Sequence, residues 1–282
     1  MTTPKTNKST PRQIVAALGW TRSSYYLMSV FLLTVFLIVY IWWPLAEEYL
    51  ALIDWSGPWW RYFDWLLVGI FLVMSLLIMA GADLRTDVWI VLVGMVGGLV
   101  IESWGTQTEI WTYYTAERPP LWIIPAWPIA SLSIDRIVRL LKNGVIETTK
   151  GTKQHKGNTF VSLHVPSWLM KSLYWVIFLA FYALMLSFVW STLNKSLTIM
   201  ALALVAFLTL TPTDYRLAVL TFIAGAGLGY FLERWGTTRL CWTYSTLQTP
   251  PLFAVLAHGM AAVAFWRLRA YLKYSGRLAG FG

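Results

Sequence analysis

The sequence predicts an all-α polytopic membrane protein with about eight transmembrane helices, arranged as two parallel four-helix repeats. The 282-residue chain is 57% hydrophobic and only 12% charged, a composition typical of membrane proteins rather than of soluble domains. Its apolar segments approach the length of about 20 residues that a membrane-spanning helix needs. A stretch of 59 residues also recurs later in the chain, with its polar and aromatic residues in the same order.

Eight apolar segments are expected to span the membrane, and polar or aromatic stretches separate them. They are residues 24–44, 63–81, 87–104, 121–141, 168–191, 195–211, 217–235 and 251–272, of which the sixth is short. Many of the 18 tryptophans stand beside these segments, where amphipathic rings favour the membrane interface. The chain then divides into a tail (1–22), a first repeat (23–142), a linker (143–166), a second repeat (167–273) and a second tail (274–282).

The basic residues predict the orientation. Seventeen of the 22 Lys and Arg residues fall on the side of the N-terminus, and five fall on the other side. Because cytoplasmic loops carry such an excess, both tails and the linker are expected in the cytoplasm, at a cell membrane of the bacterial inner-membrane type. The net charge of +9 has this same origin, so no nucleic-acid partner is expected. The polar tail runs into the first span without a cleavage site of small residues, which predicts an uncleaved helix.

The repeat aligns Asp83–Leu141 with Asp214–Leu272 at one constant offset, without a gap. Twenty of the 59 positions are identical. They include the turn after each third span, in which WGT is followed by WTY and a proline pair, at 104–120 and 235–251. The full repeats, residues 23–142 and 167–273, each contain four expected spans, an even number. The copies are therefore expected to share one orientation, with a pseudo-twofold axis along the membrane normal.

Each repeat places a glutamate on a glycine face of its third helix. Glycine, glycine and glutamate stand four residues apart at Gly94, Gly98 and Glu102, and again at Gly225, Gly229 and Glu233. Four-residue steps keep such positions on one face, and small residues let helices approach closely in lipid. If spans three and seven meet at the axis, Glu102 and Glu233 face each other and can act as acid and base.

A structural interpretation of the two glutamates stays open. Each lies near the outer end of its span, where the carboxylate can bond N–H groups and threonines of the following turn. Arg234 or Arg239 would then neutralise Glu233. Acidic residues inside a membrane are nevertheless functional candidates, so a structural role and a functional role both stay open for the two glutamates.

Aromatic and hydroxyl side chains accompany the glutamates in both copies. The candidates for substrate binding are Trp104, Thr106, Trp111, Tyr113 and Trp127, together with Trp235, Thr237, Trp242 and Tyr244. Ring faces attract cations, so a wall of rings beside an acid suits chemistry through carbocations. The alternative is an aromatic belt at the membrane interface.

The two copies differ at one candidate site position, where Trp127 in the first copy corresponds to His258 in the second. A histidine about two turns inside the last span can relay a proton with Glu102 or Glu233, so His258 is the third candidate catalytic residue. The alternative is a core histidine that bonds a backbone carbonyl on a neighbouring helix.

Several other residues are expected to be structural. Asp83 precedes the third span as a helix N-cap, as Asp214 precedes the seventh. Asp135 can pair with a following arginine at four-residue spacing. Pro125 and Pro128 are expected to kink the fourth helix.

The aromatic and acidic segment Tyr40–Trp65 lies on the outer side. It is expected either to form a lid over the site or to be a loop anchored by its tryptophans.

No metal and no cofactor are expected. Cys241 is the only cysteine, which excludes a disulfide framework and a cysteine-based metal site. His155 and His164 stand nine residues apart in the linker without clustered carboxylates. The chain carries no Walker loop, dinucleotide fingerprint, HExxH zinc motif or GxSxG elbow.

The turn E-x-x-G-T-x-T-x-x-W-x-Y-x-T, followed by Pro120, Pro125 and the pair Ala126–Trp127, resembles the membrane carotenoid hydratases. That family includes the carotenoid 1,2-hydratases and the bisanhydrobacterioruberin hydratases. The turn is more loosely similar to the heterodimer-type lycopene cyclases, which are built from duplicated helical units. The resemblance covers Glu102–Trp127 and implies cofactor-free acid/base chemistry on a polyene. Glu102 and Glu233 would donate protons, rings would stabilise the cation, and threonine and tyrosine hydroxyls would position water.

Three classes of function therefore stay open. The leading hypothesis is an enzyme that acts on a polyene or isoprenoid membrane lipid at the outer side of the repeat interface. A proton-coupled transporter or flippase uses paired acids and pseudo-symmetry equally well. A non-catalytic membrane assembly subunit would use the turns as docking surfaces. A buried apolar slot that ends at the glutamates would favour the enzyme, and a water-filled path to both faces would favour transport. The sequence leaves a homo-oligomer open.

Overall fold

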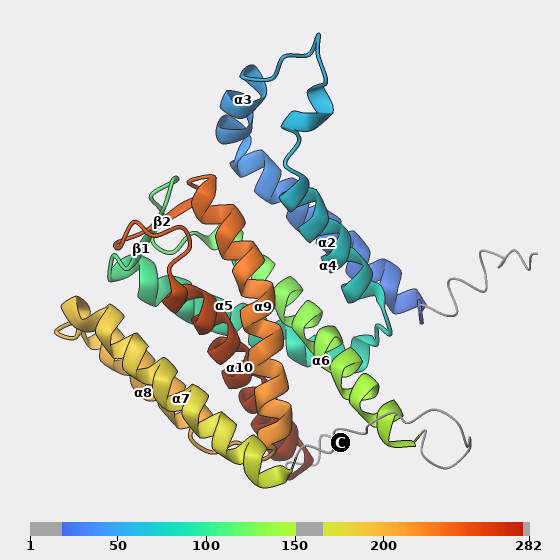
Figure 1. Ribbon diagram of the computed structural model, residues 1–282, viewed down its shortest axis with the longest axis vertical. Coiled ribbons are helices and arrows are strands. Elements are labelled where there is room, and N and C mark those ends of the chain that lie inside the picture. The colour runs from blue at the N-terminus through green and yellow to red at the C-terminus, as the bar shows by residue number, and fades with distance from the viewer. Residues whose placement is uncertain (1–18, 151–165, 279–282) are drawn as a thin grey trace, which may run out of the picture.

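A computed structural model describes residues 19–150 and 166–278, with side chains described for 19–142 and 166–274. This part of the chain is all-α apart from one short two-stranded ribbon (Figure 1). Most of the expected N-terminal tail and linker lie outside the described residues. The two linker histidines, His155 and His164, lie there as well.

Eight helices match the eight expected spans. They are α2 (Arg22–Ile41), α4 (Trp65–Met79), α5 (Leu84–Gln107), α6 (Ala126–Lys150), α7 (Ser167–Val189), α8 (Ser196–Thr209), α9 (Tyr215–Thr238) and α10 (Leu252–Leu278). Six segments are long and apolar enough to cross a membrane, whereas α4 and α8 are shorter, with 15 and 14 residues. The chain is therefore a multi-pass α-helical membrane protein.

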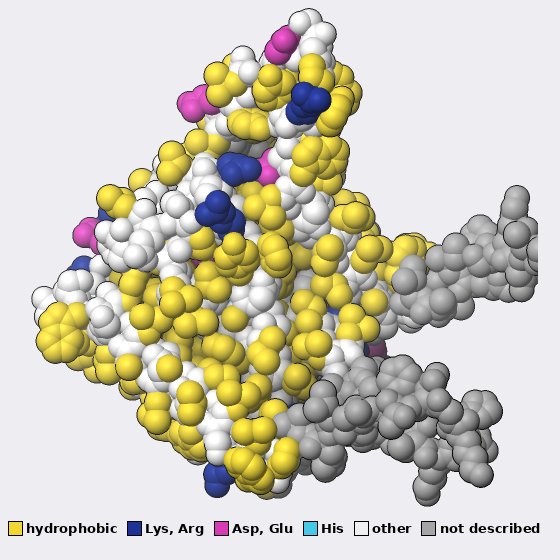
Figure 2. All heavy atoms as spheres, in the orientation of Figure 1, with side chains coloured by type: hydrophobic (Ala, Val, Ile, Leu, Met, Phe, Trp, Pro, Cys, Tyr) yellow, Lys and Arg dark blue, Asp and Glu magenta, His cyan; other side chains and the backbone are white. Residues whose placement is uncertain are grey.

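The outer surface of the helices is apolar, as expected for a surface in contact with lipid. Large apolar side chains such as Leu33, Phe36, Leu72 and Val176 are exposed on the outward faces of the helices. Figure 2 shows one such face, on which charged side chains are few and lie mainly in the upper part of the view, while hydrophobic ones cover much of the rest. A bilayer satisfies such a surface because its interior is as apolar as the side chains themselves.

The remaining elements are short: α3 (Trp43–Ala51), η1 (Trp59–Tyr62), β1 (Trp111–Tyr113), η2 (Leu121–Ile123), η4 (Trp190–Thr192) and β2 (Trp242–Tyr244). Helix α3 projects away from the other helices (Figure 1). It does not cover the ribbon, so the expected lid is not formed by α3. Trp55 and Trp60, farther along the same segment, are more than half exposed.

The helix ends follow local rules. Asp83 caps α5 by accepting from Arg85 N at 3.1 Å, and Asp214 caps α9 by accepting from Leu217 N at 2.9 Å. Both N-caps were expected. Pro125 precedes α6 and Pro128 lies in its first turn, where no intrahelical N–H is lost. The expected fourth span is thus interrupted at Pro125, between η2 and α6, and Pro128 does not break a hydrogen bond inside α6.

Two helices also run past the expected boundaries of their spans. Helix α6 continues to Lys150 and α10 to Leu278. The start of the expected linker at 143 and the start of the expected tail at 274 are therefore helical.

Four helices form the centre of the molecule, and two pairs flank them. In the centre, α5 packs on α6 and α10, while α9 packs on α10 and α6. Helix α4 packs on α2, α6 and α9 on one side, and α7 and α8 pack on α9, α10 and α5 on the other (Figure 1). Two clusters of buried apolar residues fill the space between the centre and the flanks.

The glycine faces set the spacing between α5 and α6 and between α9 and α10. A Cβ atom on Gly98 would lie 2.3 Å from Trp127 Cγ, and one on Gly229 would lie 2.5 Å from His258 Cβ. Both distances are too short for any side chain. Each glycine face therefore packs on the next helix of its own repeat, and not on the other glycine face as a meeting of spans three and seven would require.

Candidate functional site

The two WTY segments pair with each other as an antiparallel ribbon. In its register, Trp111 lies opposite Tyr244, Thr112 opposite Thr243, and Tyr113 opposite Trp242. Successive side chains of a strand point to opposite faces. The tryptophan and tyrosine of each strand therefore share one face, and both strands present that face to the ends of α5 and α9.

Glu102 is held by three donors. Its Oε1 atom accepts from Tyr113 Oη at 2.9 Å and from Trp127 Nε1 at 3.1 Å, and its Oε2 atom accepts from Trp111 Nε1 at 3.2 Å. The residue is only 3% exposed. Gly105 makes room for this arrangement, because a Cβ atom there would lie 1.8 Å from the Trp111 ring.

Glu233 is held in the same way. Its Oε1 atom accepts from Tyr244 Oη at 2.9 Å and lies 2.9 Å from His258 Nε2, and its Oε2 atom accepts from Trp242 Nε1 at 2.9 Å. The residue is 4% exposed. In each carboxyl group Oε1 therefore has two partners and Oε2 has one, so Oε2 keeps the freer position for a transferable proton.

The two glutamates are linked through a stacked pair of rings. Trp127 and His258 stack with centroids 5.8 Å apart and planes inclined by 18°. Each ring binds the Oε1 atom of a different glutamate. The structure thus brings Glu102, Trp127, His258 and Glu233 together. The alternative of a histidine bonded to a carbonyl does not describe His258.

Both tyrosines of the ribbon serve as donors. Burial, together with the neighbouring glutamate, raises the pKa of Tyr113 and that of Tyr244 well above the ordinary value. Each hydroxyl therefore stays protonated at neutral pH and donates to its carboxyl group.

The other predicted residues lie around this centre without bonding the carboxyl groups. Thr106 and Thr237 donate to the main-chain oxygens of Glu102 and Glu233, each at 2.6 Å. Trp104 donates to Thr198 on α8 at 3.2 Å.

The arginines expected beside Glu233 pair elsewhere. Arg239 binds Asp64 at 3.1 Å, and Trp235 donates to the same Asp64 oxygen at 2.7 Å. Arg234 donates to the main-chain oxygen of Thr249 at 3.1 Å. The expectation that one of these two arginines neutralises Glu233 is therefore wrong.

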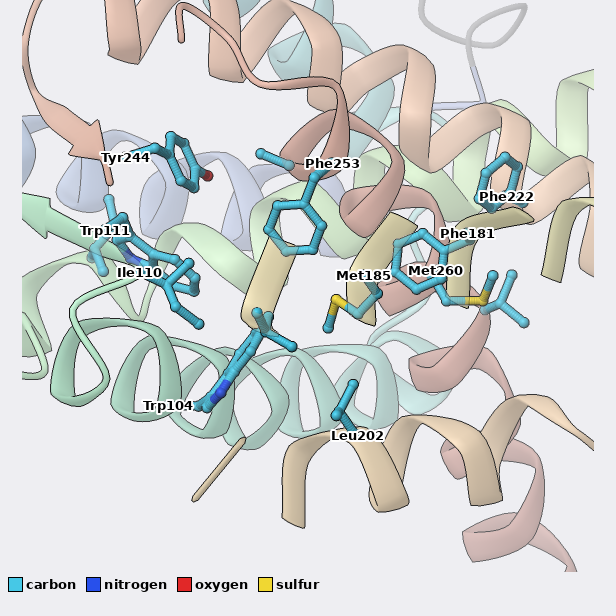
Figure 3. Close-up of a cluster of buried hydrophobic side chains, with 14 of the residues drawn as sticks. Trp104, Ile110, Trp111, Phe181, Met185, Leu202, Phe222, Tyr244, Phe253 and Met260 are labelled. Carbon is cyan, nitrogen blue, oxygen red and sulfur yellow. The ribbon is translucent and has the colours of Figure 1, made fainter. Parts of the chain in front are cut away.

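An apolar cavity of about 330 Å³ reaches both glutamates. It is lined by side chains from all eight of the helices that match the expected spans, and nearly all of them are apolar or aromatic. Figure 3 shows part of its wall, which extends from Trp111 and Tyr244 past Phe253 toward Met185 and Phe181. The polar groups at the cavity are few and converge at the glutamates, which is the usual composition of a small-molecule site.

Two aromatic residues of the cavity wall pack on predicted site residues but were not named individually as candidates. Trp42, at the junction of α2 and α3, packs on Trp235 with ring centroids 5.0 Å apart. Phe265 packs edge-on against Trp127 at 6.2 Å. Trp42 lies in the segment Tyr40–Trp65 that was expected as a lid or an anchored loop, whereas Phe265 aligns with Ile134 in the other copy, so the repeat offered no signal for Phe265.

Within the described residues, no group of three His, Cys, Asp or Glu side chains is arranged to hold a metal ion. The site is a pair of buried carboxyl groups in a frame of aromatic donors. No family model, curated protein or solved structure matches the chain, so the likeness to carotenoid hydratases stays a prediction.

Proposed function

We propose that the chain is an integral membrane enzyme that performs cofactor-free acid/base chemistry on a polyene or isoprenoid lipid. The reaction is a hydration, a cyclisation or an isomerisation. One observation carries the proposal: an almost wholly apolar cavity ends at two buried carboxyl groups, each held by three aromatic side chains. A polyene chain fits the cavity chemically, and an acid is the group needed to activate it.

Glu102 is the proton donor in this proposal. Its three partners are neutral, and the described residues place no cation beside it. Because an unpaired charge in an apolar cavity is costly, this carboxyl group is suited to carry the proton. It transfers that proton to one carbon of a C=C bond, which leaves a carboxylate and a tertiary carbocation.

The pair formed by Glu233 and His258 is the proton acceptor. Water adds to the carbocation through an oxygen lone pair, and the resulting oxonium gives a proton to this pair, so the product is a tertiary alcohol. In a cyclisation, a second double bond supplies the electron pair and the neighbouring carbon loses the proton. After the product leaves, the Glu233–His258 pair releases its proton to solvent and Glu102 takes up a proton from solvent. Both groups are then in the protonation states in which the reaction began. General acid–base steps of this kind contribute roughly 10²- to 10⁴-fold.

The rings at the cavity stabilise the cation. Trp111, Tyr244, Tyr113 and Trp242 meet in two pairs, each with centroids 5.9 Å apart. The electron-rich face of an aromatic ring attracts a cation by about 2 kcal/mol or more when water is excluded. A tertiary carbocation formed beside Oε2 of Glu102 lies within this cage.

We also propose that the chain crosses the membrane eight times, in two parallel four-helix repeats. This arrangement is supported by the contacts of the two glutamates, which recur at the offset of the repeat with tryptophan, tyrosine and a ring of α6 or α10 in both copies. Helix α4 packs on α6 and α9, and α8 packs on α10 and α5, so the short helices also occupy equivalent places. From the excess of basic residues we infer that both termini lie in the cytoplasm and the ribbon on the outer side of a bacterial inner membrane.

A proton-coupled transporter is the second candidate, because a further cavity lies at the other end of the central helices. Phe265 is the one described residue that lines both cavities. A transporter would have to move this ring to connect them. An enzyme works with the ring in place.

Deletion of the gene, followed by mass spectrometry of all lipids and pigments, tests the proposal. We expect a precursor to accumulate that differs from the missing product by one water or one ring. Complementation with Glu102→Gln or Glu233→Gln should leave the precursor, with product formation lowered by at least about 100-fold. Glu117→Gln is the matched control, because this exposed glutamate corresponds to Gln248 in the second copy. An unchanged lipid and pigment profile after deletion would overturn the proposal that the protein is an enzyme.

A further inference from the structure

A second cavity, of about 450 Å³, lies where the first halves of α5 and α9 meet residues 131–142 of α6 and 262–273 of α10. It is at the opposite end of the central helices from the ribbon, since Glu102 is near the end of α5 and Asp83 precedes its start. This inner pocket shares only Phe265 with the cavity at the carboxyl groups, among the residues that the structure describes.

Positive charge predominates in the inner pocket. Among the residues that the structure describes, four basic side chains line it, against two acidic ones, which leaves a surplus of two positive charges (4 − 2). The basic residues are Arg139, Lys142, Arg269 and Lys273, and the acidic ones are Asp83 and Asp135.

Asp135 organises the guanidinium groups. Its Oδ1 atom binds Arg269 at 3.0 Å, and its Oδ2 atom binds Arg139 at 2.7 Å and Arg136 at 3.0 Å. The bond to Arg269 joins α6 to α10, so the two arginines that line the pocket are fixed from opposite helices. One carboxylate cannot neutralise three guanidinium groups. The second nearby acid, Asp87, is committed to Arg136 at 2.6 Å and lies 4.0 Å from Arg139.

Lys142 and Lys273 complete the pocket. They are separated by the same offset as the two copies of the repeat, so they occupy equivalent positions on α6 and α10. Nothing in the described part of the chain forms an ion pair or hydrogen bond with either ammonium group. A lysine ammonium is a compact point charge that binds phosphate.

Most of the other lining residues are apolar, and Thr86, Ser131 and Thr221 add hydroxyl groups. Ile134 and Val138 from α6 lie opposite Ala262, Phe265 and Trp266 from α10. A ligand that fits this pocket has an anionic part that binds the basic side chains and an apolar part that contacts these apolar residues. Basic pockets between membrane helices bind the headgroups of acidic lipids by this combination.

We propose that the inner pocket binds a phosphate-bearing anion, supplied by the headgroup of an acidic phospholipid. The phosphate lies between Lys142 and Lys273 and receives N–H groups from Arg139 and Arg269, while the glycerol end of the lipid contacts Trp266. In the proposed orientation this pocket opens to the inner leaflet. The binding does not depend on any chemistry at the carboxyl groups.

Native mass spectrometry of the purified, delipidated full chain in mild detergent tests the site. The probes are phosphatidylglycerol and phosphatidylcholine with the same acyl chains. We expect phosphatidylglycerol to bind more tightly. The double variant Lys142→Ala/Lys273→Ala should weaken that binding roughly 30-fold, at about 1 kcal/mol for each lysine. The control Arg85→Ala/Arg216→Ala removes two exposed charges at the same end of the molecule, outside the pocket, and should change binding less than twofold.

Inorganic phosphate distinguishes the two sources of the anion. If phosphatidylglycerol stays bound in millimolar phosphate, the ligand is a lipid headgroup, as proposed. If phosphate displaces it, the pocket binds a soluble phosphate compound, and the proposal of a lipid ligand is overturned. Equal binding of the two lipids, or equal losses in the two double variants, would overturn the site altogether. Thermal unfolding of each variant checks that the fold is intact.

Discussion

Trp127 and His258 stack on each other, with ring centroids 5.8 Å apart and an angle of 18° between the rings. They are equivalent residues of the two copies, and each binds the Oε1 atom of its own glutamate. The two sites are therefore alike in geometry and differ in one respect: an indole only donates its proton, whereas an imidazole can also accept one. This difference is the basis for assigning unlike roles to Glu102 and Glu233.

Replacement of His258 by Trp separates proton transfer from structure. The indole keeps a donor for Glu233 and follows the arrangement that Trp127 already adopts beside Gly98. We expect the fold to be retained and product formation to fall by about 10²-fold or more, since the base is lost. Product assays and thermal unfolding in detergent measure the two effects. Undiminished activity would show that His258 does not accept the proton.

His258→Leu is the companion variant for stability. It leaves Glu233 with two hydrogen-bond partners in place of three, and a buried group that loses a partner costs about 1–3 kcal/mol. A lower unfolding temperature than that of His258→Trp is expected. Equal unfolding temperatures would mean that the hydrogen bond contributes little to the folded state.

Gly229→Ala is expected to destabilise the protein by about 1–3 kcal/mol, because the new methyl group meets the His258 ring in a packed interface. Gly227 lies on the same helix, and a Cβ atom there has no neighbour within 4 Å. Gly227→Ala should therefore be neutral or slightly stabilising, since alanine favours a helix over glycine. The two unfolding temperatures, measured side by side, decide this. A similar loss in both variants would contradict close packing at Gly229.

Asp87→Ala is expected to cost about 3 kcal/mol or more, because it leaves Arg136 with less compensation for its charge at a buried site. The pair lies 2.6 Å apart, and the side chains are 0% and 3% exposed. The double variant Asp87→Ala/Arg136→Met should recover part of the loss, since no buried charge is left. Denaturant titration in detergent micelles measures both.

The exposed pair of Glu109 and Arg118 is the control for this measurement. Its atoms are 2.8 Å apart, but the side chains are 60% and 45% exposed. Glu109→Ala should change stability by at most about 1 kcal/mol. A larger effect here than at Asp87 would reverse the expected ranking.

Cysteine labelling tests the orientation. Burial raises the pKa of Cys241 to about 12, so its thiol stays protonated at neutral pH and reacts slowly. The unmodified chain should thus resist a membrane-impermeant maleimide until it is denatured. Glu117→Cys, on an exposed turn, should label on intact cells, and Arg85→Cys only after permeabilisation. The opposite pattern would invert the proposed orientation.

Local pattern was enough to predict the secondary structure and the candidate residues. Apolar segment length predicted where the helices lie, and the repeat identified Glu102 and Glu233 with the aromatic residues that now surround them. Asp83 and Asp214 were recognisable as N-caps because a cap depends on the next three residues alone. Such features depend on neighbours in the chain, and a sequence displays those neighbours directly.

The partners of each group were decided only by the tertiary structure. Glu102 meets Trp127 from 25 residues away, the ribbon joins one strand from each copy of the repeat, and Arg239 binds Asp64 instead of Glu233. Such contacts depend on how the helices pack, and many packings satisfy the same apolar pattern. The sequence by itself determined that two acids and their rings lie near the ends of two glycine-faced helices. Only the packing of α6 and α10 on those helices brought Trp127 and His258 together between the two acids.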